Sequence, residues 1–271
     1  MKQDKEIVIS VKNLVKNFGA RRILNNISLD IYQGETLVVM GGSGCGKSTF
    51  LRHLIGAIQP DSGEVWMFGK DIAKASDHEM DEIRKKFGML FQSGALFDSM
   101  TVAENIALPL REHAKLDANI VNIIVKMKLE LVGLRGFENL MPAQLSGGMK
   151  KRVGLARAIV MDPRIVFYDE PTAGLDPVMT GVIDKLTIDL TKKLQITSVV
   201  VTHDMNSVFR IADRIVMLHQ GNIMQIGTPE EIQNSKNPHV KQFITGEAEG
   251  PISFVQKGDD YLDHLTAEIQ E

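Results

Sequence analysis

The order of apolar and polar positions along the chain predicts short strands separated by helical stretches. β-branched residues alternate with other positions over residues 7–31, which favours two strands joined by a turn around Gly19. Continuous apolar runs at 37–40, 165–168 and 198–202 are typical of strands that are buried on both faces. A chain that mixes strands and helices therefore follows from the pattern alone.

Helical stretches are predicted where apolar residues recur every three or four positions. Residues 50–58 form one such stretch, and the charged residues from Asp77 onward predict an exposed helix. Gly221 lies in a hairpin signal, and Thr228 begins a helix as its N-cap. A further helix is expected to pack by one apolar face, made of Ile120, Ile123, Ile124, Met127, Leu131 and Leu134.

The bulk composition is that of an ordinary globular protein, with 271 residues of which 44% are hydrophobic and 24% charged. Its 34 acidic and 31 basic residues give a net charge of −3 without a long block of either sign, so we expect no nucleic-acid partner. No apolar run approaches the roughly 20 residues that span a bilayer, and the first residues lack a signal-peptide core. Cys45 is the single cysteine, which agrees with a reducing compartment, and we expect the chain to stay in the cytoplasm.

Residues 37–49, LVVMGGSGCGKST, carry the most specific chemical pattern. A glycine-rich loop alone is most often only a turn, but here G-x-x-x-x-G-K-S lies between a strand and a helical stretch, which predicts a phosphate cradle. Its glycines can adopt positive φ and so point successive N–H groups at one anion. Lys47 would reach the β and γ phosphates, and Ser48 would bind Mg²⁺. The cradle consists of Gly41, Gly42, Ser43, Gly44, Cys45, Gly46, Lys47, Ser48 and Thr49.

A second anion site is predicted at the start of the helical stretch LSGGMKKR. Ser146, Gly147 and Gly148 stand where that helix begins. The N–H groups and the positive end of the helix dipole attract anions there. The chain therefore carries two stretches suited to phosphate.

Two adjacent carboxylates, Asp169 and Glu170, follow the buried strand RIVFY. Side chains of neighbouring strand residues diverge, so the first can face Mg²⁺ through Ser48 and water while the second reaches toward the γ-phosphate. Carboxylates paired in this way are rarely structural. We interpret them as part of a phosphate-transfer site.

Three residues have two possible interpretations at this stage, and a fourth, Gln92, is a candidate ligand-facing residue by its position. Phe18 precedes the cradle and is either a core phenylalanine or a platform for a purine, and the core reading is favoured. His203 ends a strand, where a satisfied structural histidine is the commoner case. Gln92 ends another strand, where ligand-facing residues collect. Cys45 lies near a helix N-terminus, which predicts a lowered thiol pKa, although it can also be a small residue tolerated by the loop.

The phosphate loop, Gln92, LSGGM, FYDEP, AGLD and His203, in this order and at these separations, resemble the nucleotide-binding subunit of ABC transporters. The resemblance covers about residues 7–245. It implies an α/β P-loop fold with an antiparallel β subdomain and a helical subdomain inserted at about 93–160. Residues 1–245 then form the ATPase domain and 246–271 a C-terminal tail.

The resemblance also implies roles for residues that the patterns alone leave undecided. Phe18 would stack on adenine, and residues 41–49 would bind the phosphates of ATP. Glu170 would polarise the attacking water and His203 would contact the γ-phosphate, which reverses the readings above for Phe18 and His203. Mg²⁺ would be held by Ser48, Gln92 and Asp169, and Gln92 counts with Glu170 and His203 among the catalytic residues.

A second copy of the chain is implied as well. Ser146, Gly147 and Gly148 would complete the ATP site of that copy, so the working unit resembles a head-to-tail homodimer with two ATP molecules. Two positions depart from the usual pattern: Met149 replaces a glutamine, and Phe18 replaces a tyrosine. Stacking survives the second change.

QLSGGMKKRVGLARAI and the tail segment FITGEAEGPISF look most like ATPases of Mla or Mce-type phospholipid transporters. This implies a separate membrane permease, further Mla or Mce-type components, and a peripheral place on the cytoplasmic face of the inner membrane. The cargo would be phospholipid moving between inner and outer membrane to maintain lipid asymmetry.

Two other functions stay open. One is an importer ATPase for a small polar solute. The other is a soluble ABC protein acting on ribosomes or DNA, which the single phosphate loop and the short stretch between Gln92 and Asp169 disfavour.

The tail from Gly246 has two readings. It folds loosely onto its own domain, or it crosses to the second copy and holds the dimer. Apolar positions in the tail and directly before it motivate the second interpretation: Phe243, Ile244, Ile252, Phe254, Val255, Tyr261, Leu262 and Leu265.

Overall fold

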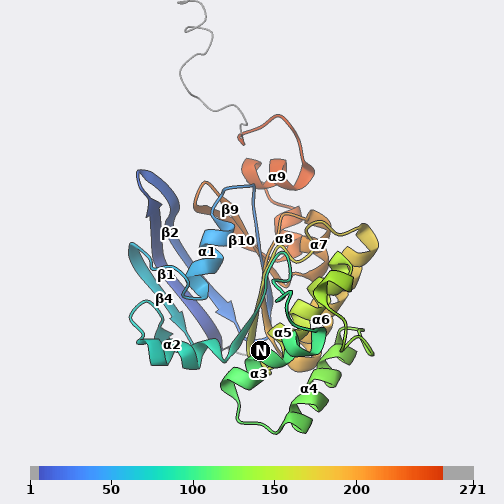
Figure 1. The fold of residues 1–271 in the computed structure, drawn as a ribbon. Helices are drawn as coiled ribbons and strands as arrows, with labels where there is room; N and C mark the ends of the chain where they lie inside the picture. Colours follow the sequence, from blue (N-terminus) through green and yellow to red (C-terminus); the bar gives the residue numbers. More distant parts are fainter. Residues whose placement is uncertain (1–5, 253–271) are drawn as a thin grey trace, which may run out of the picture.

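The structure is a computed structural model that describes residues 6–252. Within that range the strands form a four-stranded antiparallel sheet and a six-stranded sheet (Figure 1). The strands are β1 (Ile7–Phe18), β2 (Arg21–Tyr32), β3 (Thr36–Met40), β4 (Ser62–Met67), β5 (Lys70–Asp71), β6 (Phe87–Leu90), β7 (Ile165–Asp169), β8 (Thr197–Val201), β9 (Arg214–His219) and β10 (Asn222–Gly227). The helices are α1 (Lys47–Leu54), α2 (Asp77–Arg84), α3 (Val102–His113), α4 (Ala118–Leu131), the 3-10 turn η1 (Pro142–Gln144), α5 (Gly147–Ala158), α6 (Pro177–Leu194), α7 (Met205–Ile211), α8 (Pro229–Gln233) and α9 (Pro238–Thr245).

The six-stranded sheet brings the ends of its central strands to one edge. Its order is β10-β9-β3-β8-β7-β6, and all neighbours pair in parallel except β9 and β10. The carboxyl ends of β3, β7 and β8 therefore lie side by side. In sheets of this kind ligands bind beyond the carboxyl ends of the strands.

One apolar core lies where helix α1 meets both sheets. It contains Leu14 and Ile27 of the four-stranded sheet, Phe50 and Leu54 of α1, and Phe167 of β7. Each is at most 1% exposed. Full burial of such a side chain contributes about 1.5–3 kcal/mol. The core thereby holds the loop that precedes α1 against both sheets.

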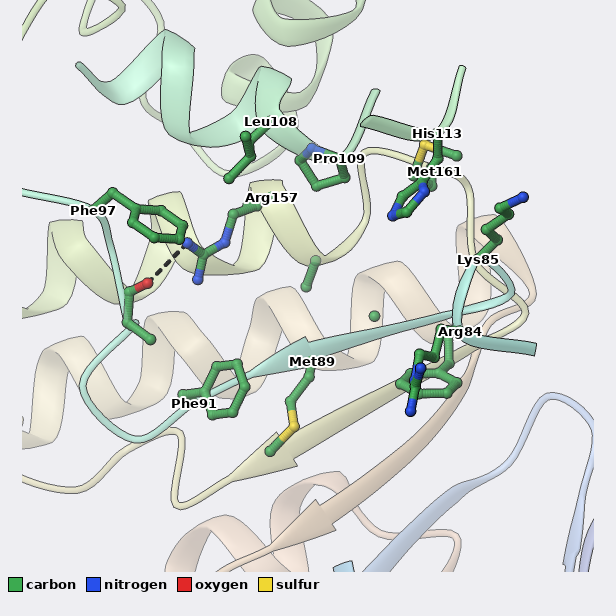
Figure 2. A pocket seen from close by; sticks show the side chains of 14 residues that line it. Arg84, Lys85, Met89, Phe91, Phe97, Leu108, Pro109, His113, Arg157 and Met161 are labelled. Carbon is green, nitrogen blue, oxygen red and sulfur yellow. Dashed lines mark hydrogen bonds between the residues drawn. The ribbon is translucent and has the colours of Figure 1, made fainter. Parts of the chain in front are cut away.

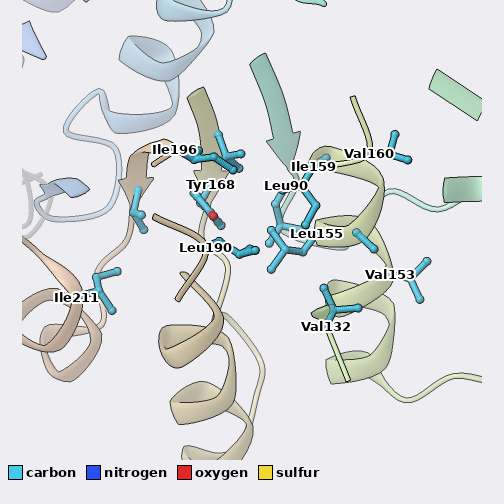
Figure 3. Close-up of a cluster of buried hydrophobic side chains, with 14 of the residues drawn as sticks. Leu90, Val132, Val153, Leu155, Ile159, Val160, Tyr168, Leu190, Ile196 and Ile211 are labelled. Atoms are coloured by element: carbon cyan, nitrogen blue, oxygen red, sulfur yellow. The ribbon is translucent and has the colours of Figure 1, made fainter. Parts of the chain in front are cut away.

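A second core fills the other face of the six-stranded sheet (Figure 3). Leu90 of β6 and Tyr168 of β7 pack against helices, with Leu155 of α5 and Leu190 of α6 in the same cluster. Helices α3, α4 and α5 lie within residues 93–160. The division of the chain into subdomains remains a prediction.

The face by which α4 packs differs from the predicted one at four of the six predicted positions, whereas Ile124 packs against the core and Leu134, just beyond the helix, is buried. Met127 is 61% exposed and Ile123 is 59% exposed, and Ile120 and Leu131 are exposed as well. The buried positions of α4 are Val121, Val125, Lys128 and Leu129. The helix carries apolar residues on two sides, so periodicity identifies the helix without selecting the side that α3 and α5 cover.

Other local predictions differ only at element ends or are confirmed. The helix expected over 50–58 ends at Leu54, because the chain turns through Gly56 at φ +68°. Strand β6 ends at Leu90, so Gln92 lies two residues beyond it. The hairpin at Gly221 is present, and Thr228 caps α8.

The beginning of the tail folds back on its own domain. Gln242 of α9 donates to the carbonyl oxygens of Glu247 and Ile252, and the N–H of Ile252 donates to Gln242 Oε1 at 2.7 Å. The remaining predicted tail positions lie outside the described residues: Phe254, Val255, Tyr261, Leu262 and Leu265. Among residues 6–252 no helix has both the length and the apolar character needed to cross a membrane.

Candidate functional site

The glycine loop joins the buried strand β3 to the first turn of α1. Gly41, Gly44 and Gly46 have φ of 152°, 71° and 109°, whereas Gly42 is not in the positive range. A Cβ at Gly41 would lie 2.2 Å from the carbonyl oxygen of Leu218. The expectation for Gly42 is therefore wrong, while the other three positions need glycine. The loop ends at the N-terminus of α1, where unpaired N–H groups attract anions.

Lys47 holds its ammonium group inside this loop. Its side chain donates to the carbonyl oxygens of Gly41 and Gly42 at 2.8 and 3.0 Å, and the residue is 8% exposed. The positive charge and the positive end of α1 reinforce each other. The loop is therefore an electropositive cradle for phosphate.

Phe18 forms a wall beside the cradle. It lines a pocket of about 260 Å³ together with Arg21, Ile23, Gly44 and residues 46–49. Phe18 is 52% exposed, so it is not a core phenylalanine, and Lys16 Nζ lies 5.6 Å from its ring centroid. Sequence reasoning missed Arg21, although a basic residue just after the Gly19 turn was a usable signal.

Asp169 ends β7 and faces the start of α1. The hydroxyl of Ser48 lies near its carboxylate. Burial raises the pKa of Asp169, as does the neighbouring charge of Glu170. The positive charges of Arg52 and Lys47 and the Ser48 hydroxyl oppose this rise of the pKa. The structure thus brings Asp169 and Ser48 together.

Glu170 leaves the strand instead of continuing it. Its φ is +48°, an uncommon value for a residue with a side chain, and its N–H donates to the carbonyl oxygen of Val201 at 2.9 Å. The expected divergence of two strand side chains is therefore replaced by a sharp turn after Asp169. Residues in such conformations persist only where the surrounding structure enforces them, commonly at functional sites.

His203 stands next to the Glu170 carboxylate. Its Nδ1 lies 2.9 Å from Glu170 Oε2, and its side chain is 65% exposed. Despite this short distance, Oε2 is buried and has no well-aligned hydrogen bond within residues 6–252. A buried carboxylate oxygen with free lone pairs can accept a hydrogen bond from water. His203 is not the satisfied structural histidine that the pattern alone favoured.

Glu170 and His203 also line a separate pocket of about 300 Å³. The turn 172–175 forms its other side, together with Thr180 and Asp204. Asp204 is the N-cap of α7 and accepts from the N–H groups of Asn206 and Ser207, which anchors the chain directly after His203.

Ser146 and Gln92 stand apart from these residues. Ser146 caps α5 by accepting from the N–H of Met149 at 3.3 Å, and Ser146 and Gly147 are exposed. Gln92 is exposed, and its side chain makes no hydrogen bond in the described part of the chain. Neither pocket above includes them. Their roles remain predictions.

Cys45 contradicts the expectation of a reactive thiol. The residue is 6% exposed, and burial raises the pKa of its thiol, against smaller lowering effects of Lys47 and nearby backbone N–H groups. Desolvation of a thiolate outweighs the helix N-terminus here because Cys45 points into the core that contains Phe50.

Slow alkylation of Cys45 is therefore expected. At pH 7.5 maleimide should label the native chain at least about tenfold more slowly than the urea-unfolded chain, because little of a thiol with a raised pKa is thiolate below that pKa. The labelling rate, followed by mass spectrometry, should rise with pH. Equal rates for the native and the unfolded chain would contradict the buried placement.

A groove lies between β6 and the helices α3 and α5. Figure 2 shows Phe91, Phe97 and Leu108 around it, and its volume is about 420 Å³. Arg157 of α5 donates to the carbonyl oxygen of Ala95 at 2.8 Å and so holds the loop that follows Gln92. The groove and the Gln92 loop thus share one short segment.

Comparison with known proteins identifies the arrangement. Residues 24–173 match the sequence pattern of the ABC transporter family. The chain belongs to that family. It is 44% identical to the intermembrane phospholipid transport system ATP-binding protein MlaF of Haemophilus influenzae, over 95% of this chain and 98% of that protein. It is also 44% identical to the probable ribonucleotide transport ATP-binding protein mkl of Mycobacterium leprae, over 94% of this chain and 73% of that protein.

A solved ABC structure has the same fold. The cassette MJ0796, as a dimer in a post-hydrolysis state bound to ADP and Pi, superimposes with a TM-score of 0.75 and is 33% identical. The alignment covers 82% of this chain and 98% of that chain. The predicted α/β P-loop fold and the predicted ABC ATP-binding subunit are confirmed.

Proposed function

We propose that this ABC protein is the ATP-hydrolysing subunit of a phospholipid transporter and drives a separate membrane permease. The match to MlaF, which extends over 98% of that relative, carries the proposal. The site geometry suits the reaction, because the glycine loop and Lys47 can hold phosphates while Phe18 offers a face for adenine. Glu170 then orients and polarises the attacking water with its carboxylate, whose Oε2 lies 2.9 Å from His203 Nδ1.

Mg²⁺ fits the residues beside the loop. The Ser48 hydroxyl lies near the Asp169 carboxylate, and one hydroxyl, one carboxylate, phosphate oxygens and water are the ligands that this ion prefers. Gln92 is the third proposed ligand and would have to approach from its exposed loop. The bound ion would neutralise charge on the phosphates, and His203 would contact the γ-phosphate.

The working unit is proposed to be a homodimer. Ser146 and Gly147 are exposed at the start of α5, with the buried Gly148 behind them. None of the three lines the pocket of the chain's own glycine loop, and they would reach the ATP of a second copy. The dimeric cassette MJ0796 supports this assembly by its similarity. A contribution of residues 246–271 to the dimer remains a prediction.

The groove of Figure 2 is proposed to receive a helix of the permease that faces the cytoplasm. Its exposed phenylalanines suit an apolar helix face, and the neighbouring Gln92 loop would carry the contact to the ATP site. The protein would then be peripheral on the cytoplasmic face of the inner membrane. Further Mla or Mce-type components complete the proposed assembly.

A second candidate cargo comes from the relative mkl, which is named for ribonucleotide transport. The two cargoes differ in a measurable way. The full chain is purified from membranes with its partners, the partners are identified by mass, and the complex is reconstituted in vesicles. ATP-dependent movement of labelled phospholipid is expected, and it should be absent when the complex carries Glu170→Gln. ATP-dependent ribonucleotide transport without phospholipid movement would overturn the proposal.

A further inference from the structure

Lys151 is a buried cation in the middle of α5. The residue is 4% exposed, and its Nζ donates to the carbonyl oxygen of Ala173 at 2.5 Å. Within residues 6–252 this is the one hydrogen bond of its ammonium group. Burying a lysine is costly unless its charge is compensated. A lysine kept in such a place therefore calls for an explanation.

Ala173 belongs to the turn that begins at Glu170. Its N–H donates to the carbonyl oxygen of Glu170 at 3.2 Å, and its own carbonyl oxygen accepts from Lys151. On the other side, the N–H of Glu170 donates to Val201 of β8. The strained backbone of Glu170 is thus held between a strand and a turn, and Lys151 fastens the turn.

The charge of Lys151 also acts toward this carboxylate. Burial lowers the pKa of Lys151, and the negative charge of Glu170 opposes that lowering. The Glu170 carboxylate is therefore close enough to interact electrostatically with the buried ammonium group. The hydrogen bond to the turn at Ala173 and the electrostatic interaction thus both connect Lys151 to Glu170.

We propose that Lys151 is a positioning residue for Glu170: it fastens the 170–173 turn to α5 and so keeps the carboxylate where it can orient water. The inference rests on the proposed role of Glu170 in ATP hydrolysis. It assigns no contact between Lys151 and ATP. The helix that begins at Ser146 thereby also supports the hydrolytic carboxylate of its own chain.

Lys151→Met tests the proposal, since methionine keeps an apolar stem of similar length and removes the charge and the donor. In the complex of this chain with its membrane partners, kcat for ATP hydrolysis should fall roughly 10- to 100-fold. Small displacements of a catalytic group reduce rates by factors of this size. The KM for ATP, the affinity for ATP and the melting temperature should stay close to wild type. Lys150→Met is the matched control, because Lys150 is the adjacent lysine on α5 and its side chain makes no hydrogen bond or ion pair among the described residues.

A double variant separates positioning from a general structural role. If Lys151 acts through Glu170, adding Lys151→Met to Glu170→Gln should not lower the residual single-turnover rate further. The inference would be overturned if the rate losses of the two single variants multiplied in the double variant. An unchanged kcat of Lys151→Met, or a fall of its ATP affinity and melting temperature along with kcat, would also overturn it. Where the methionine variant does not fold, Lys151→Gln takes its place. Normal hydrolysis by Glu170→Gln alone would instead contradict the proposed function.

Discussion

Glu170→Gln should leave ATP bound and reduce its hydrolysis by roughly 100- to 10,000-fold, the usual contribution of a positioned general base. The amide is nearly isosteric but accepts a proton poorly, so water near Oε2 would lose its partner. The contact with His203 Nδ1 would also change from carboxylate to amide. ATP turnover of the purified complex, measured alongside equilibrium binding of ATP, checks the prediction.

Lys47→Ala is the control for that result, because it should affect binding. Loss of a charged hydrogen-bond donor costs about 1.5–3 kcal/mol, which corresponds to roughly 10- to 100-fold in ATP affinity. The two variants should therefore separate binding from chemistry. Near wild-type turnover by the Glu170→Gln complex would refute the assignment of Glu170.

Ser146→Arg should abolish hydrolysis while each monomer keeps its own ATP affinity. An arginine at the exposed start of α5, which does not line the pocket of the chain's own loop, would fill the space where the phosphates of the partner's ATP are proposed to lie. We expect turnover to fall at least about 100-fold, since the loss of one oriented donor to a reacting oxyanion already costs that much. Turnover and monomer binding are the two measurements.

Thr228→Arg is a suitable control for Ser146→Arg. It removes the N-cap of α8, just as Ser146→Arg removes the N-cap of α5. Loss of a cap costs about 1 kcal/mol and should leave turnover largely intact. Mixing Ser146→Arg with Lys47→Ala chains should restore one intact composite site in each mixed dimer. A Ser146→Arg chain that loses its own ATP affinity would argue against a shared site.

Local sequence determined the parts of this protein that depend on short-range geometry. The glycine loop could be recognised because positive φ at Gly41, Gly44 and Gly46 and the following helix start are encoded within a few residues. The N-cap at Thr228 and the hairpin at Gly221 follow from the same kind of rule. Polar residues that directly follow a buried apolar run could likewise be recognised from a few neighbouring residues in the sequence.

Only the tertiary structure decided which side of an element is covered and which groups meet. Periodicity detected α4 but not its buried face, because burial depends on the neighbouring helices. The placement of Cys45 in a core raises the pKa of its thiol, an effect larger than the lowering by Lys47 and nearby backbone N–H groups. The turn at Glu170 and its fastening by Lys151 join segments far apart in sequence, and no local pattern encodes such a contact.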